Sequence, residues 1–280
     1  MKIHVNGVDY FYTIQGSGPP LLLLHGFTGD HSTWTDFVQS MQDVYTLLSL
    51  DLLGHGKASI PADPPRYEIK QMANDLAAIL EKLKLEKVHV LGYSMGGRLA
   101  LSFAILFPEK VKSLILESAS PGLDSAEERE ARIQQDERLA QLIEEKGMKE
   151  FVDYWQDIPL FATQKHLPAI RQGEIRKQRL QQNPVGLAGS LRGMGTGQQP
   201  SWWPYLNAVR MPVQLICGER DVKFCQIAKD MAKIMSNAKI TKVPDAGHAI
   251  HVEVPKRFGT IVREFLSQFR KESDYVDSMD

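Results

Sequence analysis

Three residues along the chain have the types and the order that catalysis by an activated oxygen needs. Gly92-Tyr93-Ser94-Met95-Gly96 fits the pattern G-x-S-x-G, and Asp221 and His248 follow it in that order. A serine oxygen becomes reactive when a histidine can accept its proton, and the histidine in turn needs a carboxylate to orient it. The three residues therefore predict a catalytic triad with Ser94 as its reactive oxygen.

The sequence around Ser94 supports this interpretation. The apolar run Val88–Leu91 precedes the serine, and the helical pattern Arg98–Leu106 follows it. A strand, a tight turn and a helix in this order lift a serine oxygen clear of a sheet. Asp221 and His248 also come just after predicted strands, where open α/β sheets place their sites. The alternatives are a plain turn whose serine caps a helix and a loop histidine bonded to the backbone.

Other side chains compete for these roles. Glu219 and Asp245 are alternative acids, but the position of Asp221 after its strand matches the expected loop better. His251, three residues after His248, could suggest a metal pair; no third ligand at a suitable spacing and no HExxH motif accompany it, so we predict no metal site. A nucleotide cofactor is not predicted either, because the glycines that might suggest one follow no strand and open no strand–helix unit. These are Gly193, Gly195 and Gly197.

A second loop could stabilise negative charge on a reacting oxygen. His25-Gly26-Phe27 follows the apolar run Leu21–Leu24. A loop in that place can direct a backbone N–H group at a developing oxyanion, and the residue directly after the reactive serine supplies another. We therefore expect the N–H groups of Phe27 and Met95 to form an oxyanion hole. The alternative for the first loop is a simple glycine turn.

The elements that must position these residues alternate along the chain. Short, wholly apolar runs indicate strands buried on both faces, and helical patterns lie between them. This alternation predicts an α/β fold with a mainly parallel sheet covered by helices on both faces, and an early hairpin around Asn6-Gly7 predicts an antiparallel edge. The predicted strands are Lys2–Val5, Val8–Tyr12, Leu21–Leu24, Val44–Leu50, Val88–Leu91, Leu114–Leu116, Val213–Cys217 and Ile240–Val243. The predicted helices cover about 34–41, 69–84, 95–106, 226–236 and 256–269.

Residues 122–204 interrupt this alternation. The stretch is helical in pattern and has no strand-like run, and the capping-box pattern Ser125-Ala-Glu-Glu128 opens its first helix. We interpret it as a helical cap inserted into an α/β core formed by residues 1–121 and 205–280.

Composition excludes several classes of protein. The 280 residues contain 33 basic and 34 acidic side chains, a balance without the basic excess that nucleic acid or anionic lipid attracts. No apolar run approaches the length of a membrane span, and we expect no membrane association. Two cysteines, Cys217 and Cys225, make no disulfide framework. They fit a reducing cytoplasmic setting.

Taken together, the motifs resemble those of the α/β-hydrolase superfamily across nearly the whole chain. The general features are Leu-Leu-His-Gly-Phe27, Asp51-Leu-Leu-Gly-His-Gly56, Gly92-Tyr-Ser-Met-Gly-Gly-Arg98, Cys217-Gly-Glu-Arg-Asp221 and Ala246-Gly-His248. More narrowly, the chain resembles the 2-succinyl-6-hydroxy-2,4-cyclohexadiene-1-carboxylate synthases of menaquinone biosynthesis. The features behind this resemblance are Arg98, Pro121-Gly-Leu123 with Ala126-Glu-Glu-Arg129, Gly195-Thr-Gly-Gln-Gln-Pro-Ser-Trp202, and Cys217-Gly-Glu-Arg-Asp-Val-Lys-Phe224.

The narrower resemblance implies a lyase reaction rather than a hydrolysis. Enzymes of this kind eliminate pyruvate from 2-succinyl-5-enolpyruvyl-6-hydroxy-3-cyclohexene-1-carboxylate and leave a conjugated diene. The triad then acts as a base on carbon, with Ser94 activated by His248, and no cofactor is needed. The substrate carries three carboxylates, so its pocket should hold several fixed cations.

The same resemblance implies which residues bind that small polycarboxylate. It indicates Arg98, Arg129 and Arg179 as carboxylate clamps and Lys223 as a further cation near the Asp221 loop. Tyr93 and Trp155 would line the site, although the neighbouring Tyr154 makes the alignment ambiguous by one residue. The alternative for Arg129 and Arg179 is a solvated helix face.

Two other classes of function share many of these motifs. A serine hydrolase, cleaving esters or carbon–carbon bonds, would use Ser94 to attack a carbonyl carbon. A cluster of arginines favours an anionic substrate over a neutral ester. A receptor that binds a small molecule in the same fold would not need an intact triad.

Overall fold

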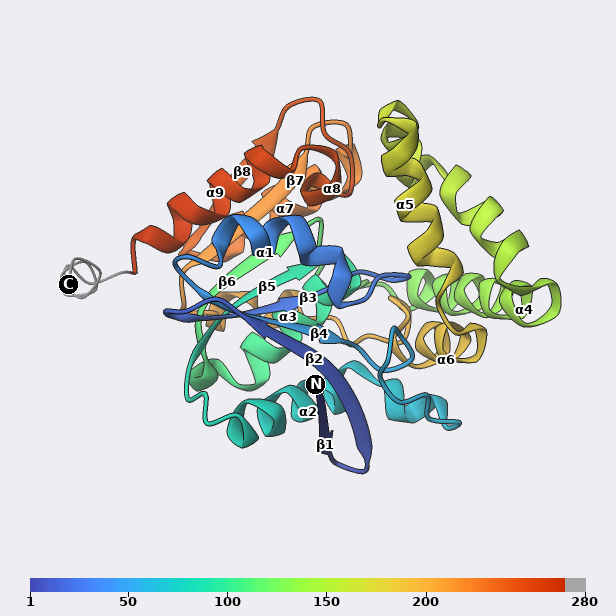
Figure 1. Cartoon of the computed structure of the whole chain (residues 1–280), viewed down its shortest axis with the longest axis horizontal. Helices are drawn as coiled ribbons and strands as arrows, with labels where there is room; N and C mark the ends of the chain where they lie inside the picture. Colours follow the sequence, from blue (N-terminus) through green and yellow to red (C-terminus); the bar gives the residue numbers. More distant parts are fainter. Residues whose placement is uncertain (270–280) are drawn as a thin grey trace.

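The computed structural model describes residues 1–269 and places an eight-stranded sheet at the centre of the molecule (Figure 1). The strand order is β1-β2-β4-β3-β5-β6-β7-β8. β2 pairs antiparallel with β1 and β4, and all other neighbours are parallel. The expected mainly parallel sheet with an antiparallel edge is confirmed. The strands are β1 Lys2–Val5, β2 Val8–Gln15, β3 Pro20–Leu24, β4 Thr46–Asp51, β5 Val88–Tyr93, β6 Val111–Glu117, β7 Val213–Gly218 and β8 Ala238–Val243.

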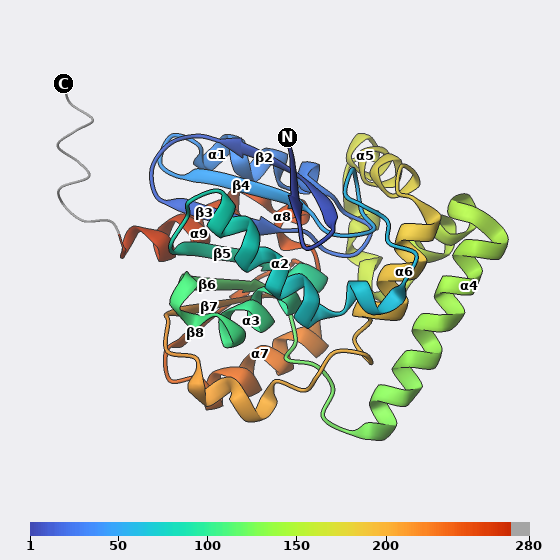
Figure 2. The same ribbon diagram turned by 90° about the horizontal axis from the view of Figure 1, so that it is seen from below.

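Helices cover both faces of the sheet (Figure 2). Residues of α1 and α9 share one buried hydrophobic cluster with one face, and residues of α2, α3 and α7 share another with the opposite face. Within residues 1–269, no helix combines the length and the apolarity that crossing a membrane requires. The helices of these layers are α1 Thr35–Met41, α2 Ile69–Lys82, α3 Met95–Leu106, α7 Val222–Ile234, α8 Ile250–Glu253 and α9 Pro255–Ser267. Short 3-10 helices are η1 His31–Trp34, η2 Pro64–Tyr67, η3 Pro108–Lys110 and η5 Trp203–Ala208.

Several boundaries differ from the sequence prediction by a few residues, and two of them have a clear local reason. The strand expected from Val44 begins at Thr46, because the N–H groups of Val44 and Tyr45 donate to the Met41 carbonyl and close the end of α1. Helix α7 begins at Val222 rather than near residue 226. The Asp221 side chain accepts a hydrogen bond from the backbone N–H of Phe224 and caps the helix there.

Three further helices lie between β6 and β7 and stand beside the sheet (Figure 1). We call them, with the 3-10 helix between them, the inserted helices: α4 Ala126–Asp157, η4 Pro159–His166, α5 Ala169–Leu180 and α6 Pro184–Met194. The side chain of Ser125 caps α4 by accepting from the N–H of Glu128, as its capping pattern predicts. α4 breaks at Gly147, whose φ of +80° suits glycine. α4 and α6 bury a hydrophobic cluster of their own.

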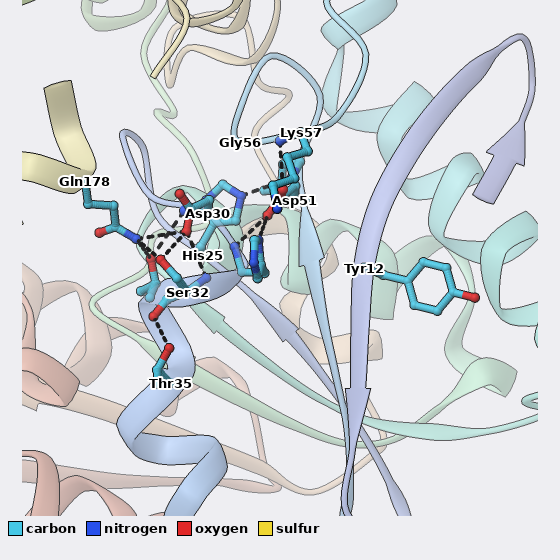
Figure 3. Close-up of polar contacts among 12 residues, drawn as sticks. Tyr12, His25, Asp30, Ser32, Thr35, Asp51, Gly56, Lys57 and Gln178 are labelled. Carbon is cyan, nitrogen blue, oxygen red and sulfur yellow. Dashed lines mark hydrogen bonds and ion pairs between the residues drawn. The ribbon is translucent and has the colours of Figure 1, made fainter. Parts of the chain in front are cut away.

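Hydrogen bonds tie α5 to the loops after β3 and β4 (Figure 3). The Gln178 amide donates to Asp30 Oδ1 at 3.0 Å and to Ser32 Oγ at 3.0 Å. The Gln182 side chain donates to Asp30 Oδ2 at 3.2 Å and accepts from the Gly56 N–H at 3.0 Å. These contacts fix α5 against the sheet end from which the inserted helices depart.

A buried histidine in β5 makes the fold sensitive to acid. Burial, and after it the charge of Lys112, lowers the pKa of His89 from 6.5 to about 4. The folded state therefore holds this ring neutral while the unfolded chain takes up a proton below pH 6.5. The resulting loss of unfolding free energy accumulates between pH 6.5 and 4 and is worth about 3 kcal/mol.

We expect His89→Gln to reduce this pH dependence, since glutamine does not titrate, while buried His25 and His55, whose pKa values burial also lowers, retain their part of it. Urea unfolding at pH 7 and pH 5 measures the slope, and His166→Gln, at an exposed position, is the control. An unchanged slope in His89→Gln would contradict the assignment, whatever the variant's stability at pH 7.

Candidate active site

The structure brings Ser94, His248 and Asp221 into one hydrogen-bonded chain. His248 Nε2 lies 2.9 Å from Ser94 Oγ, and His248 Nδ1 lies 2.7 Å from Asp221 Oδ2. A carboxylate only accepts hydrogen bonds, so Nδ1 carries the ring proton and Nε2 is free to accept the serine hydroxyl. Asp221 and His248 are buried, while Ser94 is partly exposed to the cavity in front of it. In this arrangement His248 can accept the proton of the Ser94 hydroxyl, and Ser94 can in turn accept a proton from a bound molecule.

The turn that carries Ser94 is strained in the way its motif predicts. Ser94 has a φ of +50°, in the left-handed region, between the end of β5 and the start of α3. A Cβ at Gly92 would stand 2.3 Å from the Gly96 carbonyl oxygen, and one at Gly96 would stand 2.2 Å from the Leu24 carbonyl oxygen. Larger residues at either glycine would push the serine out of place.

The rival acids stand elsewhere. Glu219 forms an exposed ion pair with Lys242, and Asp245 forms one with Arg220. Neither carboxylate is bonded to His248. The structure therefore places only Asp221, among these three acids, beside the histidine.

A carboxylate that the sequence analysis did not identify holds the loop around His248. Glu253 accepts hydrogen bonds from the backbone N–H groups of Gly247, at 2.6 Å, and Ala249, at 3.4 Å. It also accepts from the hydroxyl of Thr163 in η4 at 3.0 Å. The inserted helices and the histidine loop are thus joined at one side chain. No local motif marks this residue, because its partners are backbone groups and a distant threonine.

His251, considered above as a metal ligand, is bound in another way. Its Nδ1 lies 2.9 Å from both carboxylate oxygens of Glu117, and both residues are buried. The ring also packs against Tyr93, with centroids 4.6 Å apart. His251 therefore supports the wall behind Tyr93 through its contacts with Glu117 and the Tyr93 ring.

The backbone donors expected for an oxyanion hole are both available. Within residues 1–269, the N–H groups of Phe27 and Met95 donate to no other part of the chain. Phe27 and Met95 line the same cavity as Ser94. Met95 is the first residue of α3, where helix N–H groups point outward and favour negative charge.

That cavity has a volume of about 450 Å³ and lies between the sheet end and the inserted helices. One wall is aromatic, with Trp155 packed edge-on against Phe27 at 5.5 Å between ring centroids. Three cations line the cavity, namely Arg98, Arg132 and Lys223, with two acids, Glu128 and Asp136. The remaining aromatic lining is Tyr93, Phe161 and Phe224. Such a cavity can hold an anionic molecule with a flat apolar part.

Arg98 is the most buried of the three cations. It extends from α3, and its Nη1 donates to Gln199 Oε1 at 2.9 Å. Burial, and then the nearby charge of Arg132, lower the pKa of Arg98 to about 10. The guanidinium therefore stays charged at neutral pH and is available to an anion in the cavity.

Arg132, and not Arg129, is the α4 arginine that lines this cavity. Arg129 instead lines a separate hollow with Pro64, Glu68 and Arg192. The two arginines are three residues apart, and 100° per residue turns their side chains by about 60° around the helix axis. The predicted placement of Arg129 in the substrate pocket is thus corrected by the structure. Arg132 Nε donates to Asp136 Oδ1 at 2.9 Å.

The pair offers a matched test. We expect Arg132→Met to raise the KM for an anionic substrate by roughly tenfold or more, the effect of losing a charge-assisted hydrogen bond. Arg129→Met, which removes the same charge one turn earlier, should change KM by less than about twofold. Steady-state kinetics of both variants would decide, and a larger effect from Arg129 would reject the placement.

Arg179 and Trp155 also have definite places. Arg179 is buried in α5, with its Nη2 3.1 Å from Gln164 Oε1 and its guanidinium carbon 4.7 Å above the Phe161 ring. It lines a neighbouring cavity of about 480 Å³, while the Phe161 ring beneath it lines the triad cavity. Burial lowers the pKa of Arg179 to about 10. Tyr154 is exposed, whereas Trp155 faces the triad cavity and its buried indole N–H has no partner among the described residues.

A group of possible metal ligands lies outside this cavity. Single ligand atoms of Asp30, His31 and Asp51 fall within 4.8 Å of one another. Figure 3 shows Asp30 and Asp51 in this group. Asp51 Oδ1 already accepts from the N–H and the ring of His31, and its Oδ2 accepts from the N–H of Lys57. The group is explained as a brace between the loops after β3 and β4.

Comparisons with known proteins agree with the geometry. Residues 19–255 match the family model of the alpha/beta hydrolase fold. A 2-succinyl-6-hydroxy-2,4-cyclohexadiene-1-carboxylate synthase of Enterobacter sp. (strain 638) is 32% identical over 248 residues, covering 89% of this chain and 92% of the relative. A protein of Bacillus subtilis (strain 168) that carries the same name in provisional form is 46% identical over 260 residues, covering 91% and 94%. The solved structure of MenH from S. aureus superposes with a TM-score of 0.88 at 37% identity, covering 92% of this chain and 98% of that one.

Proposed function

Since this chain belongs to the α/β-hydrolase fold family and, within it, to the 2-succinyl-6-hydroxy-2,4-cyclohexadiene-1-carboxylate synthases, we propose that it carries out their reaction as a lyase. The substrate would be 2-succinyl-5-enolpyruvyl-6-hydroxy-3-cyclohexene-1-carboxylate. The products would be pyruvate and the cyclohexadiene that gives these synthases their name. The observation that carries the proposal is the Ser94–His248–Asp221 chain opening on a cavity lined by Arg98, Arg132 and Lys223.

The charges of the cavity suit a polycarboxylate. Arg98 is hydrogen-bonded to a neutral side chain, and Arg132 donates a hydrogen bond to Asp136. Lys223 is exposed at the rim of the cavity. Fixed guanidinium groups bind carboxylates with two parallel hydrogen bonds and fix their orientation. The substrate's carboxylates would occupy these cations, while its ring packs on the aromatic wall around Trp155.

The triad would act as a base on carbon. The reaction begins with removal of a proton from the ring carbon next to the succinyl ketone. Ser94 Oγ, hydrogen-bonded to His248 Nε2, would take this proton and pass it to the imidazole, and Asp221 would stabilise the resulting imidazolium. No acyl-enzyme forms, since no carbonyl carbon is attacked.

The electron pair that the broken C–H bond leaves on the substrate creates a negative charge that must be stabilised. The pair released from the C–H bond first forms an enolate on the ketone oxygen, and the free N–H groups of Phe27 and Met95 would stabilise it. As the enolate collapses, a double bond forms between ring carbons 2 and 3, the existing double bond moves from carbons 3 and 4 to carbons 4 and 5, and the C–O bond at carbon 5 to the enolpyruvyl group breaks. The departing enolate takes up one proton to become pyruvate. Atoms and electrons balance without an external oxidant or reductant, so the step requires no redox cofactor.

The inserted helices would form the cap of this site, with residues 122–204 as a lid and the rest as the α/β core, residues 270–280 lying outside the described part. Contacts at Asp30 and Glu253 join the two. The free thiols of Cys217 and Cys225 support a reducing cytoplasmic setting.

Turnover of the proposed substrate is the direct test. Pyruvate release and diene absorbance would be followed together, against the spontaneous reaction without enzyme. We expect both signals to appear in equal amounts and with acceleration. No acceleration would reject the lyase assignment, and cleavage of a carboxylic ester with a covalent intermediate on Ser94 would identify a serine hydrolase instead.

A further inference from the structure

The segment Gly195–Trp202 is rich in glycine and glutamine, and one of its glutamines contacts a cation of the triad cavity. Gln199 lies in this segment with 1% of its surface exposed. Its Oε1 accepts the 2.9 Å hydrogen bond from Arg98 Nη1. A guanidinium has only donors, so the oxygen and not the nitrogen of the amide must face it. Gln199 is therefore a buried acceptor aimed at Arg98, the most buried of the cations that line the triad cavity.

The neutrality of this acceptor is unusual for its position. Buried arginines normally pair with carboxylates, because an uncompensated charge is costly to bury. Within residues 1–269, Arg98 forms no ion pair; Asp136 acts on it through its charge alone and is itself ion-paired with Arg132. The guanidinium of Arg98 thus has no carboxylate of the described chain hydrogen-bonded to it, and it lines the cavity.

The chain around Gln199 is built to reach this place. Trp202 anchors the segment, because its indole N–H donates to Ser102 Oγ at 2.8 Å and its backbone N–H donates to the Pro121 carbonyl at 2.8 Å. Gly197 passes close under α4, where a Cβ would stand 2.5 Å from the Arg129 carbonyl oxygen. Close approach here requires glycine, and it brings Gln199 against α3.

We propose that Gln199 is a positioning residue that holds the guanidinium of Arg98 toward the cavity while leaving it free to pair with a carboxylate of the ligand. The identity of that ligand rests on the proposed function. The positioning role does not, since it concerns any carboxylate that enters the cavity. A neutral acceptor both orders the arginine and keeps the site selective for anions.

The decisive comparison is Gln199→Glu with Gln198→Glu. Both add one negative charge by the same change, but Gln198 is exposed, whereas a glutamate at 199 would pair with Arg98. The probe is propane-1,2,3-tricarboxylate, whose binding is measured by calorimetry on the full chain. We expect Gln199→Glu to weaken binding by roughly ten- to a hundredfold, the cost of one charge-assisted hydrogen bond. Gln198→Glu should weaken it less than about twofold.

A third variant separates positioning from simple packing. Gln199→Met keeps the volume but offers no acceptor, so Arg98 becomes less ordered while its charge is retained. The proposal expects binding in the order wild type, Met, Glu, with the KM of the lyase reaction following that order more strongly than kcat. If Gln199 had a purely structural role, the Glu variant would bind more tightly than the Met variant, because glutamate keeps the hydrogen bond that methionine loses. For the same reason, thermal unfolding should rank the Glu variant as more stable than the Met variant.

Each result decides the proposal. Unchanged tricarboxylate binding in Gln199→Glu, or no binding by the wild type, would overturn it. If Gln199→Glu does not fold, at least a threefold loss of binding in Gln199→Met supports it, and an unchanged affinity overturns it. Absence of lyase turnover with the expected binding order would reject the proposed function but leave the role of Gln199 intact.

Discussion

Replacing Ser94 by alanine should lower kcat for pyruvate elimination by about 100- to 10,000-fold, the usual contribution of a positioned general base. The change removes the hydroxyl oxygen that lies 2.9 Å from His248 Nε2 and lines the cavity with it. The imidazole would then have to take the proton from the substrate directly, over the space that the serine oxygen had filled. Single-turnover diene formation measures the loss without interference from product release.

The control is Ser120→Ala, at another serine that lines the same cavity. It should retain kcat within about threefold. Alanine keeps the Cβ of serine and meets the same backbone strain at the φ of +50°, so the turn should persist and the variant should bind propane-1,2,3-tricarboxylate as the wild type does. Activity near the wild-type level in Ser94→Ala would show that the serine is not in the proton path.

Replacing Arg98 by methionine should lower kcat/KM for the polycarboxylate by roughly ten- to a hundredfold, since each charged hydrogen bond contributes about 1.5–3 kcal/mol. The loss should appear mainly in KM. Methionine fills much of the aliphatic volume, and the exposed Arg138→Met controls for net charge.

Substrate charge makes this experiment specific. Any hydrolysis of a small neutral ester at Ser94 should survive Arg98→Met almost unchanged, because such an ester needs no cation. An equal loss of both activities would point to a folding defect and would contradict a carboxylate-binding role for Arg98.

Much of the fold followed from local sequence. Apolar runs such as Leu21–Leu24 can only be buried on both faces, and Asn6 and Gly7 both adopt the positive φ that their hairpin requires. The motif around Ser94 carries its own turn, because Gly92 and Gly96 remove the side chains that would block it. The resemblance to the synthases, stated from these motifs, is confirmed by relatives that cover nearly the whole chain.

Side chains on the inserted helices were harder to place. Arg129 and Arg132 belong to one amphipathic stretch with many charges, and nothing local says which of them faces the cavity. The packing of α4 on α6 sets the rotation of the helix and turns Arg132 inward. The break at Gly147 then returns the chain so that Trp155, rather than Tyr154, meets the aromatic wall.

The sequence by itself determined the order of strands and helices, the strained serine turn and the acid and histidine that follow it, because each depends on residues adjacent in the chain. Only the tertiary structure decided which cations share the cavity, that Glu253 braces the histidine loop, and that Gln199 faces Arg98. These contacts join segments separated by 90 residues for Thr163–Glu253 and 101 residues for Arg98–Gln199. Such pairs arise from the packing of whole elements, and no local pattern of residue types encodes them.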